Sequence, residues 1–273
     1  MKRVQYIVID ENDQVIMQSG INSSFIPIHS CAKPFQILPI FLLGLDTKYN
    51  LSKQELTIMS SSMLAQDMHV TTIIKLLDKL GIETDELSVA SSAPYGQIAY
   101  RNWKQRRKAP SIIYNPCVGN HIAMFLAQRE LTGSGTGYLR FDSPIQNMIF
   151  DIVQDFFGCG KDDIQISRDN CGAPCYSMTL KTLAYGYRNL CTDAQCDRNK
   201  YQFAIKKLRT AFNNCPRYLE GDGCLSTIIS RKKGLIGKTG ANGTLGISLN
   251  KPKCGMAIYS QDENWIAVAE VVS

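Results

Sequence analysis

Strand patterns lie at both ends of this chain of 273 residues and helix patterns lie between them, and this order limits the folds that the chain can form. Near the N-terminus, the runs Val4–Asp10 and Gln14–Ser19 flank a polar turn, which predicts a β-hairpin. Short apolar runs between residues 234 and 272, the last of them Trp265–Val272, are separated by turn-forming residues and predict an antiparallel meander. We therefore expect one α+β (α/β) domain over residues 1–273, with both ends in one antiparallel sheet and the helices packed against it.

The middle of the chain, about residues 50–215, is predicted to be helical. Ser52 and Glu55 have the spacing of a capping box, which places a helix start there. Ser30 has the chemistry of an N-cap for an earlier helix, which Pro39 should bend or shorten. Apolar periodicity predicts further helices over residues 70–80, 121–130, 144–157, 176–190 and 200–212.

Composition and charge argue against several classes of protein. The net charge is +6, and the densest basic runs, residues 104–108 and 231–233, are short, so we expect solvated faces and no nucleic-acid partner. The first apolar run meets Asp10 too early for a signal peptide, and no apolar stretch approaches the roughly 20 residues that cross a membrane. We expect a cytoplasmic protein whose ten cysteines are buried thiols or metal ligands.

The segment Ser30-Cys31-Ala32-Lys33 places a lysine three residues after a serine at a predicted helix start. Residues at this spacing share one face of a helix, so the Lys33 amine can reach the Ser30 hydroxyl. A serine needs a base to become a nucleophile, and a lysine serves when desolvation or a second cation lowers its pKa. The segment therefore indicates a Ser–Lys catalytic pair, with a simple helix cap as the alternative interpretation of Ser30.

The segment Lys238-Thr239-Gly240 lies at the end of a predicted strand and supplies a second cation, a hydroxyl and a residue that lets substrate approach the backbone. S-x-x-K followed much later by K-T-G is typical of serine β-lactamases and penicillin-binding proteins, and it favours a β-lactamase-like fold. The S-D-N motif of that group is absent, and residues 60–62, all serine, are the natural place for a second hydroxyl. The alternative interpretation of Lys238 is a surface lysine beside a turn, and that of residues 60–62 is a helix end rich in small polar residues.

Four segments resemble the bacterial type II L-asparaginase family of the Rhizobium etli enzyme, which has a β-lactamase-like fold. Residues 29–36, HSCAKPFQ, resemble the family's R-S-x-x-K-P-F-Q, and residues 115–121, NPCVGNH, resemble N-x-C-S-G-K-H. Residues 169–174, DNCGAP, and residues 238–243, KTGANG, resemble D-G-C-G-A-P and K-x-G-A-E-G. The resemblance extends from about residue 5 to the C-terminus, and the combination of S-x-x-K-P-F-Q with D-x-C-G-A-P is highly specific.

This resemblance implies a role for each matching residue and a homodimer that acts on a small-molecule amide. Two zinc ligands are implied at Cys117 and Cys171, with Asn120 at the position where the family has a third ligand, a lysine. The implied catalytic residues form two Ser–Lys pairs: Ser30 with Lys33, and Ser62 with Lys238. The implied substrate-binding positions are His29, Asn120, Asp169, Gly172, Thr239 and Gly240.

The chain differs from the family at positions that the resemblance implies bind the substrate or the metal. The family's arginine before the nucleophile is His29 here, and its glutamate in K-x-G-A-E-G is Asn242. The H-S-G-E that follows the second serine in the family is MLAQ here, residues 63–66. Since Asn120 is a poor zinc ligand, either water completes a Zn²⁺ site or the two cysteines are simply buried thiols.

The leading hypothesis is an amidase that converts asparagine to aspartate and ammonia through an acyl-enzyme on Ser30. The alternatives are a penicillin-recognising serine hydrolase and a non-enzymatic relative that binds a ligand. The cytoplasmic expectation and the D-x-C-G-A-P segment argue against the first alternative, whereas the changes at Asn120 and Asn242 favour the second. His69 and His121 are expected to have structural roles.

Overall fold

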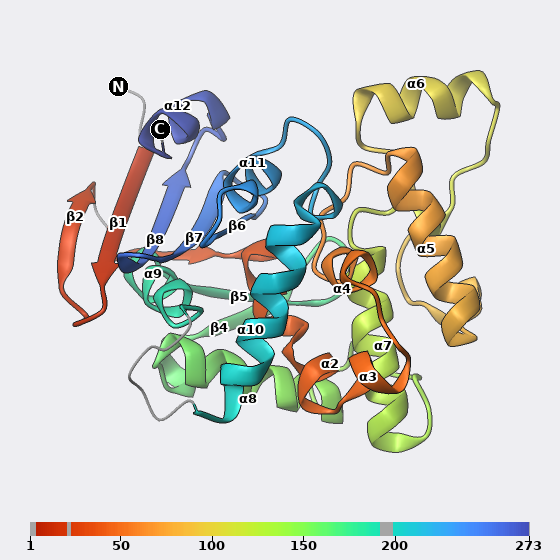
Figure 1. Ribbon diagram of the computed structural model, residues 1–273, viewed down its shortest axis with the longest axis horizontal. Coiled ribbons are helices and arrows are strands. Elements are labelled where there is room, and N and C mark those ends of the chain that lie inside the picture. The colour runs from red at the N-terminus through yellow and green to blue at the C-terminus, as the bar shows by residue number, and fades with distance from the viewer. Residues whose placement is uncertain (1–3, 21–22, 192–198, 273) are drawn as a thin grey trace.

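The computed structural model describes residues 4–20, 23–191 and 199–272 (Figure 1). Its larger sheet contains strands β1 Val4–Asp10, β2 Val15–Ser19, β6 Leu235–Thr239, β7 Thr244–Asn250 and β8 Lys253–Ser260. They are antiparallel and lie in the order β2–β1–β8–β7–β6. The predicted hairpin is present, and β8 pairs with β1 along its whole length. Both ends of the chain therefore join in one antiparallel sheet, which confirms the predicted α+β class.

Alternate side chains of this sheet enter two separate cores. Ile7 of β1 faces the main core, where α9 (Leu180–Arg188) lies across the sheet. Leu245 of β7 faces the opposite side and packs with α11 (Leu225–Arg231) and α12 (Trp265–Val272). Figure 1 shows α11 and α12 on one face of the sheet and α9 on the other. Because successive side chains of a strand point to opposite faces, helices can cover both faces of the sheet.

Most of the predicted helices are present in the middle of the chain. The capping box is confirmed, since the Glu55 backbone N–H donates to Ser52 Oγ at 3.2 Å and the Ser52 N–H donates to Glu55 Oε2 at 2.6 Å. This box starts α4 Lys53–Ile58. The other helices of this part and of the segment before it are α1 Lys33–Gln36, α2 Leu38–Leu42, α3 Leu45–Lys48, α5 Asp67–Leu80, α6 Gln97–Gln105, α7 Val118–Thr132, α8 Pro144–Phe157 and α10 Asn199–Asn214. Short 3₁₀ turns are η1 His29–Ala32, η2 Thr84–Glu86, η3 Ile112–Tyr114, η4 Lys161–Asp163 and η5 Pro216–Tyr218.

A second sheet interrupts the predicted helical middle, so the helix prediction over residues 176–190 is wrong for its first part. This sheet has the order β3–β5–β4, with β3 Phe25–Pro27, β4 Gln165–Arg168 and β5 Pro174–Thr179. The helix α9 begins only after Thr179, whose Oγ1 accepts a hydrogen bond from the Thr182 N–H at 3.1 Å. The strand forms because residues 25–27 and 165–168 offer backbone partners on both sides, which the local pattern does not reveal.

The prediction of a final strand at Trp265–Val272 is also wrong, because these residues form α12. The Asn264 side-chain oxygen accepts a hydrogen bond from the Ala267 N–H at 3.0 Å and so caps the first turn. Val268 is buried against the sheet and anchors the helix there. A short apolar run fits a strand or a buried helix equally well, and here the cap and the tertiary contact decide.

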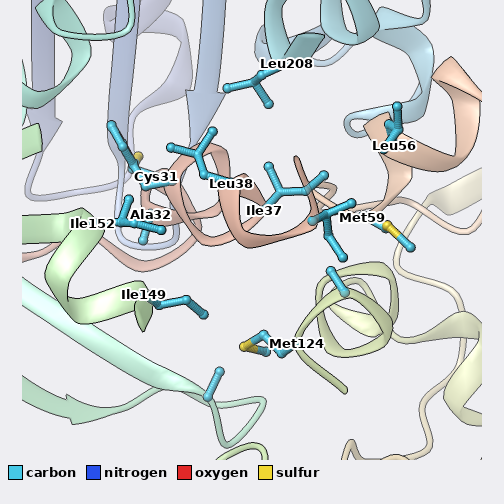
Figure 2. Close-up of a cluster of buried hydrophobic side chains, with 14 of the residues drawn as sticks. Cys31, Ala32, Ile37, Leu38, Leu56, Met59, Met124, Ile149, Ile152 and Leu208 are labelled. Atoms are coloured by element: carbon cyan, nitrogen blue, oxygen red, sulfur yellow. The ribbon is translucent and has the colours of Figure 1, made fainter. Parts of the chain in front are cut away.

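The segment that carries Ser30 is a 3₁₀ turn, so the prediction of Ser30 as a helix N-cap is wrong. Ser30 lies inside η1, and Ile28 precedes the turn without a side-chain cap. The following helix is divided into α1 and α2 at Ile37, two residues before Pro39, as the proline predicted. Figure 2 shows Ile37 among the buried side chains that surround this segment. The apolar surroundings hold the turn rigidly at the end of the larger sheet.

The described helices include none that is both long and apolar enough to cross a membrane.

Close backbone packing of α9 on β8 generates a stability prediction. A Cβ atom at Gly255 would lie 2.0 Å from the Ala184 backbone oxygen, so Gly255→Ala forces the helix away from the sheet. We expect a loss of about 3 kcal/mol in the free energy of unfolding, measured by urea denaturation. In the control Gly160→Ala, φ is negative and the new Cβ would make only an ordinary contact of 3.6 Å with Asp163 Oδ2, so stability should change by less than about 0.5 kcal/mol. Equal stability of the two variants would contradict this packing.

Candidate active site

Three elements hold the turn that presents Ser30. The Ile28 N–H donates to the Tyr176 carbonyl of β5 at 2.9 Å, and the Cys31 thiol donates to the Lys238 carbonyl of β6 at 3.1 Å. The Tyr187 hydroxyl of α9 donates to the Cys31 carbonyl at 2.9 Å. A Cβ at Gly240 would lie 2.6 Å from the Ile28 oxygen, so the glycine of K-T-G lets the end of β6 approach this turn. The two motifs are thus joined by direct backbone packing.

A cavity of about 610 Å³ opens beside this turn. Ser30 and Ser62 both line it, and the two lysines of the predicted pairs are buried behind its wall. Two predicted substrate-binding residues, Asn120 and Gly172, do not contribute to the lining. The other predicted site residues in the lining are His29, Cys117, Asp169, Cys171, Thr239 and Gly240.

The Ser62 hydroxyl lies between two lysine side chains. Its Oγ is 3.2 Å from Lys33 Nζ and 2.9 Å from Lys238 Nζ. Lys33 Nζ also donates to the Ser61 carbonyl at 2.5 Å and lies 3.3 Å from Cys117 Sγ. Among the described residues no hydrogen bond joins Lys33 to Ser30, so the structure brings Lys33 to the second serine. The predicted Ser62–Lys238 pair is present as a direct contact.

Glu220 is the partner that the sequence analysis missed. Its Oε1 accepts hydrogen bonds from Lys238 Nζ at 3.2 Å and from the Thr239 hydroxyl. The Glu220 carbonyl also accepts the Leu64 N–H at 2.8 Å, which ties this carboxylate to the Ser62 segment. Both partners of the ion pair are buried, with side-chain exposures of 0% for Lys238 and 8% for Glu220. A buried lysine needs a carboxylate partner, and this need could have prompted a search for one in the sequence. No motif marks Glu220 as that partner.

The charges around Lys238 act on its pKa in opposite directions. Burial lowers the pKa because the ammonium loses its hydration, and the nearby charge of Lys33 lowers it further. The Glu220 carboxylate raises the pKa and so limits this effect. Burial and the Lys33 charge therefore disfavour the charged form of Lys238, and the Glu220 carboxylate favours it.

Cys117 and Cys171 lie together, as the resemblance to the zinc-binding family implied. A hydrogen bond from the Cys171 thiol, aided by the Lys33 ammonium, lowers the pKa of Cys117 to about 5. The same bond and burial raise the pKa of Cys171. Two cysteines could supply thiolate ligands to zinc, and the buried Asn120 offers an amide whose Nδ2 has no hydrogen-bond partner.

The donor set around these two thiols is incomplete for zinc. Within the described ranges, no third imidazole, thiol or carboxylate ligand atom joins them at metal-binding distance. Lys33 Nζ already occupies one side of the Cys117 thiol, at 3.3 Å from its Sγ. Zinc at this pair therefore stays a prediction, and no chemical step below depends on it.

His29 and Asn242, the two positions where charged family residues are missing, contact each other. His29 Nε2 lies 3.0 Å from Asn242 Nδ2, and His29 Nδ1 lies 3.3 Å from Asp169 Oδ1. Hydrogen bonding to Asp169, and then to Cys175, raises the pKa of His29 to about 10. The Asp169 carboxylate therefore favours the protonated form of His29, in the wall of the cavity.

The two other histidines have structural contacts, as expected. His69 Nδ1 accepts the Gln66 N–H at 3.1 Å and caps α5, while His69 Nε2 lies 3.0 Å from the Arg217 carbonyl. His121 Nδ1 lies 2.6 Å from the Tyr138 hydroxyl. Burial, reinforced by the Lys33 charge, lowers the pKa of His121 to about 3, so this imidazole is neutral.

Comparison with known proteins decides the family. A family model described as L-asparaginase II matches residues 1–272. The chain belongs to the L-asparaginase II family. No curated protein matches this family member.

Two solved structures illustrate the structural similarity of this L-asparaginase II family member. A crystal structure of Mglu in its native form in the presence of 4.3 M NaCl is 12% identical, with a TM-score of 0.41 over 95% of this chain. The chain spans 56% of the length of that Mglu chain. A structure from Bacteroides dorei DSM 17855, titled as a "putative beta-lactamase", is 11% identical, with a TM-score of 0.46 over 94% of this chain and 84% of that one.

The buried ion pair in this L-asparaginase II family member generates a prediction for stability. Lys238→Met leaves the Glu220 carboxylate buried and unpaired, and we expect a loss of about 3–5 kcal/mol in the free energy of unfolding. The double variant Lys238→Met/Glu220→Gln removes both charges and should recover most of that loss. Urea denaturation of the wild type, both single variants and the double variant forms the cycle. Additive losses would contradict a coupled pair.

Proposed function

We propose that this member of the L-asparaginase II family is an amidohydrolase that releases ammonia from the side-chain amide of L-asparagine. The observation that carries the proposal is the Ser62 hydroxyl, held between Lys33 and Lys238 in the wall of the cavity that Ser30 also lines. Two amines around one hydroxyl provide a route for a proton beside a nucleophile. The cytoplasmic location and the homodimer stay predictions.

In the proposed first step, Ser30 Oγ attacks the amide carbon of the substrate. The Ser30 proton passes to Ser62 as the Ser62 proton passes to Lys33, while Lys238 donates a hydrogen bond to Ser62 Oγ. The backbone N–H of Ser30 stabilises the negative charge that develops on the carbonyl oxygen. The ester bond to Ser30 forms as the C–N bond breaks.

The lysine proton then returns to the leaving nitrogen through Ser62, and ammonia departs. Water attacks the acyl-enzyme in the second half of the reaction and gives its proton to the same Ser62–Lys33 route. The ester bond breaks, the Ser30 hydroxyl recovers its proton, and aspartate is released. Each proton taken by Lys33 is thus returned within one turnover, so the cycle balances.

The cavity wall offers groups of both charge signs for an amino-acid substrate. His29 is cationic and can pair with an α-carboxylate, whereas Asp169 can pair with an α-ammonium group. Thr239 also lines the cavity, and its hydroxyl donates a hydrogen bond to Glu220 Oε1. Because His29 and Asn242 stand where the family has an arginine and a glutamate, we propose that the chain holds its substrate through the His29–Asp169 side of the cavity.

Replacement of the nucleophile tests the proposal directly. Ser30→Ala should lower ammonia release from L-asparagine by about 10⁴-fold or more while the protein stays folded. Ammonia release from L-glutamine and related amides is measured in parallel, with and without added zinc. The matched control is Ser167→Ala, an exposed serine of β4 outside the cavity, which should keep wild-type activity. Wild-type activity in Ser30→Ala would refute this mechanism.

The opposing effects on Lys238 predict the pH dependence of the reaction. We expect kcat/KM to rise with pH as Lys238, one of the two amines at the Ser62 hydroxyl, loses its proton. Because Glu220 raises the pKa of Lys238, Glu220→Gln should move this rising limb to lower pH. The control is Glu130→Gln, which removes a surface ion pair with Lys48 and should leave the limb in place. A shift to higher pH in Glu220→Gln would contradict the assignment.

A further inference from the structure

Three metal-binding side chains converge at one edge of the cavity, apart from the Cys117–Cys171 pair. His29 comes from the turn η1, while Asp169 and Cys175 come from the hairpin of β4 and β5. His29 Nδ1 lies 3.3 Å from Asp169 Oδ1 and 3.7 Å from Cys175 Sγ. All three ligand atoms lie within 4.8 Å of one another.

The spacing of these atoms fits a tetrahedral zinc site. Zinc lies about 2.0–2.2 Å from nitrogen and oxygen ligands and about 2.3 Å from sulfur. At a tetrahedral angle, these bond lengths separate nitrogen from oxygen by about 3.3–3.5 Å and nitrogen from sulfur by about 3.5–3.6 Å. The distance of 3.3 Å from His29 Nδ1 to Asp169 Oδ1 lies in this range, and the distance of 3.7 Å to Cys175 Sγ lies just above it.

A single proton on His29 Nδ1 cannot serve both neighbours. The imidazole nitrogen carries at most one hydrogen, yet Asp169 Oδ1 and Cys175 Sγ both face it. A cation at the centre of the three atoms would satisfy the nitrogen, the carboxylate and a thiolate at once. The combination of imidazole, carboxylate and thiolate is a donor set that zinc prefers.

The surroundings support a formed site. Cys175 is 2% exposed, and the side chains of His29 and Asp169 are 14% and 19% exposed. The Asn242 amide nitrogen lies 3.0 Å from His29 Nε2, and rotation of this amide would present its oxygen as the acceptor that the Nε2–H of a metal-bound histidine needs. His29 has a φ of 45°, in the left-handed region that a side chain rarely adopts, and this conformation aims its ring at the other two ligands.

We propose that His29, Asp169 and Cys175 bind Zn²⁺ as three protein ligands, with the fourth position open to the cavity. His29 and Asp169 line the cavity, so that a water or a substrate oxygen can reach this position. Binding releases the His29 Nδ1 proton and the Cys175 thiol proton. Two positive charges arrive as two protons leave, and the net charge of the site is unchanged. The inference does not depend on the amidase proposal, and with Zn²⁺ bound the metal would replace protonated His29 as the positive charge in this part of the cavity wall.

Cobalt titration tests the site without an activity measurement. The purified full chain is stripped with a chelator and titrated with Co²⁺, whose thiolate complexes absorb in the near ultraviolet. We expect one equivalent to produce a thiolate-to-cobalt band that zinc abolishes. The band should be lost in Cys175→Ser and kept in the control Cys117→Ser/Cys171→Ser, which lacks the other pair of thiols. Zinc affinity of Cys175→Ser should fall roughly tenfold or more.

Two results would overturn the inference. If the band is lost in Cys117→Ser/Cys171→Ser and kept in Cys175→Ser, the metal binds at the Cys117–Cys171 pair. If the wild type gives no band, His29 and Asp169 form only a hydrogen-bonded ion pair and bind no metal. Circular dichroism of each stripped variant checks the fold. If Cys175→Ser does not fold, Asp169→Asn decides the question, because it keeps all thiols and should still weaken Co²⁺ binding roughly tenfold or more.

Discussion

The buried charge of Lys238 is the constraint on which the arrangement of the candidate site depends. Its side chain is fully buried, and such a cation needs a carboxylate and hydrogen-bond acceptors around it. Glu220 supplies the carboxylate, Ser62 supplies an acceptor, and the Glu220 backbone holds the segment on which Ser62 lies. The contact between Ser62 and Lys33 follows from this placement. One ion pair between the sheet and the helical part therefore positions the second serine and both amines.

The sequence predicted which site residues lie together better than it predicted the local structure. The resemblance to the family implied that Ser62 and Lys238 form a pair, and the structure brings them into contact. The strand β5 and the helix α12 were assigned the wrong structure, because their form depends on pairing partners and packing surfaces that are distant in the sequence. Glu220 was missed for a related reason: its role is defined by a lysine that joins it only in the fold.

The departures from the family are coupled to one another in space. His29 and Asn242 stand where the family has an arginine and a glutamate, and their side chains are in contact. The two departures therefore lie side by side, and the residues keep a polar contact with each other. The contacts of Ser62 with Lys33 and Lys238 involve neither of them. Under the proposed function, the groups that hold the substrate could thus change without a change in the Ser–Lys arrangement.

The position of β8 in the sheet has a consequence for how the molecule assembles. This strand lies between β1 and β7, although it is the last strand along the chain. The N-terminal hairpin cannot pair into the larger sheet until residues 253–260 have been made, and Ser30 and Lys238 come from segments 208 residues apart (238 − 30). Contacts at such separation close slowly because the chain must first lose the entropy of a long loop. The turn η1 that carries Ser30 therefore gains its full set of partners only at a late stage of folding. A chain that is still incomplete cannot assemble the site.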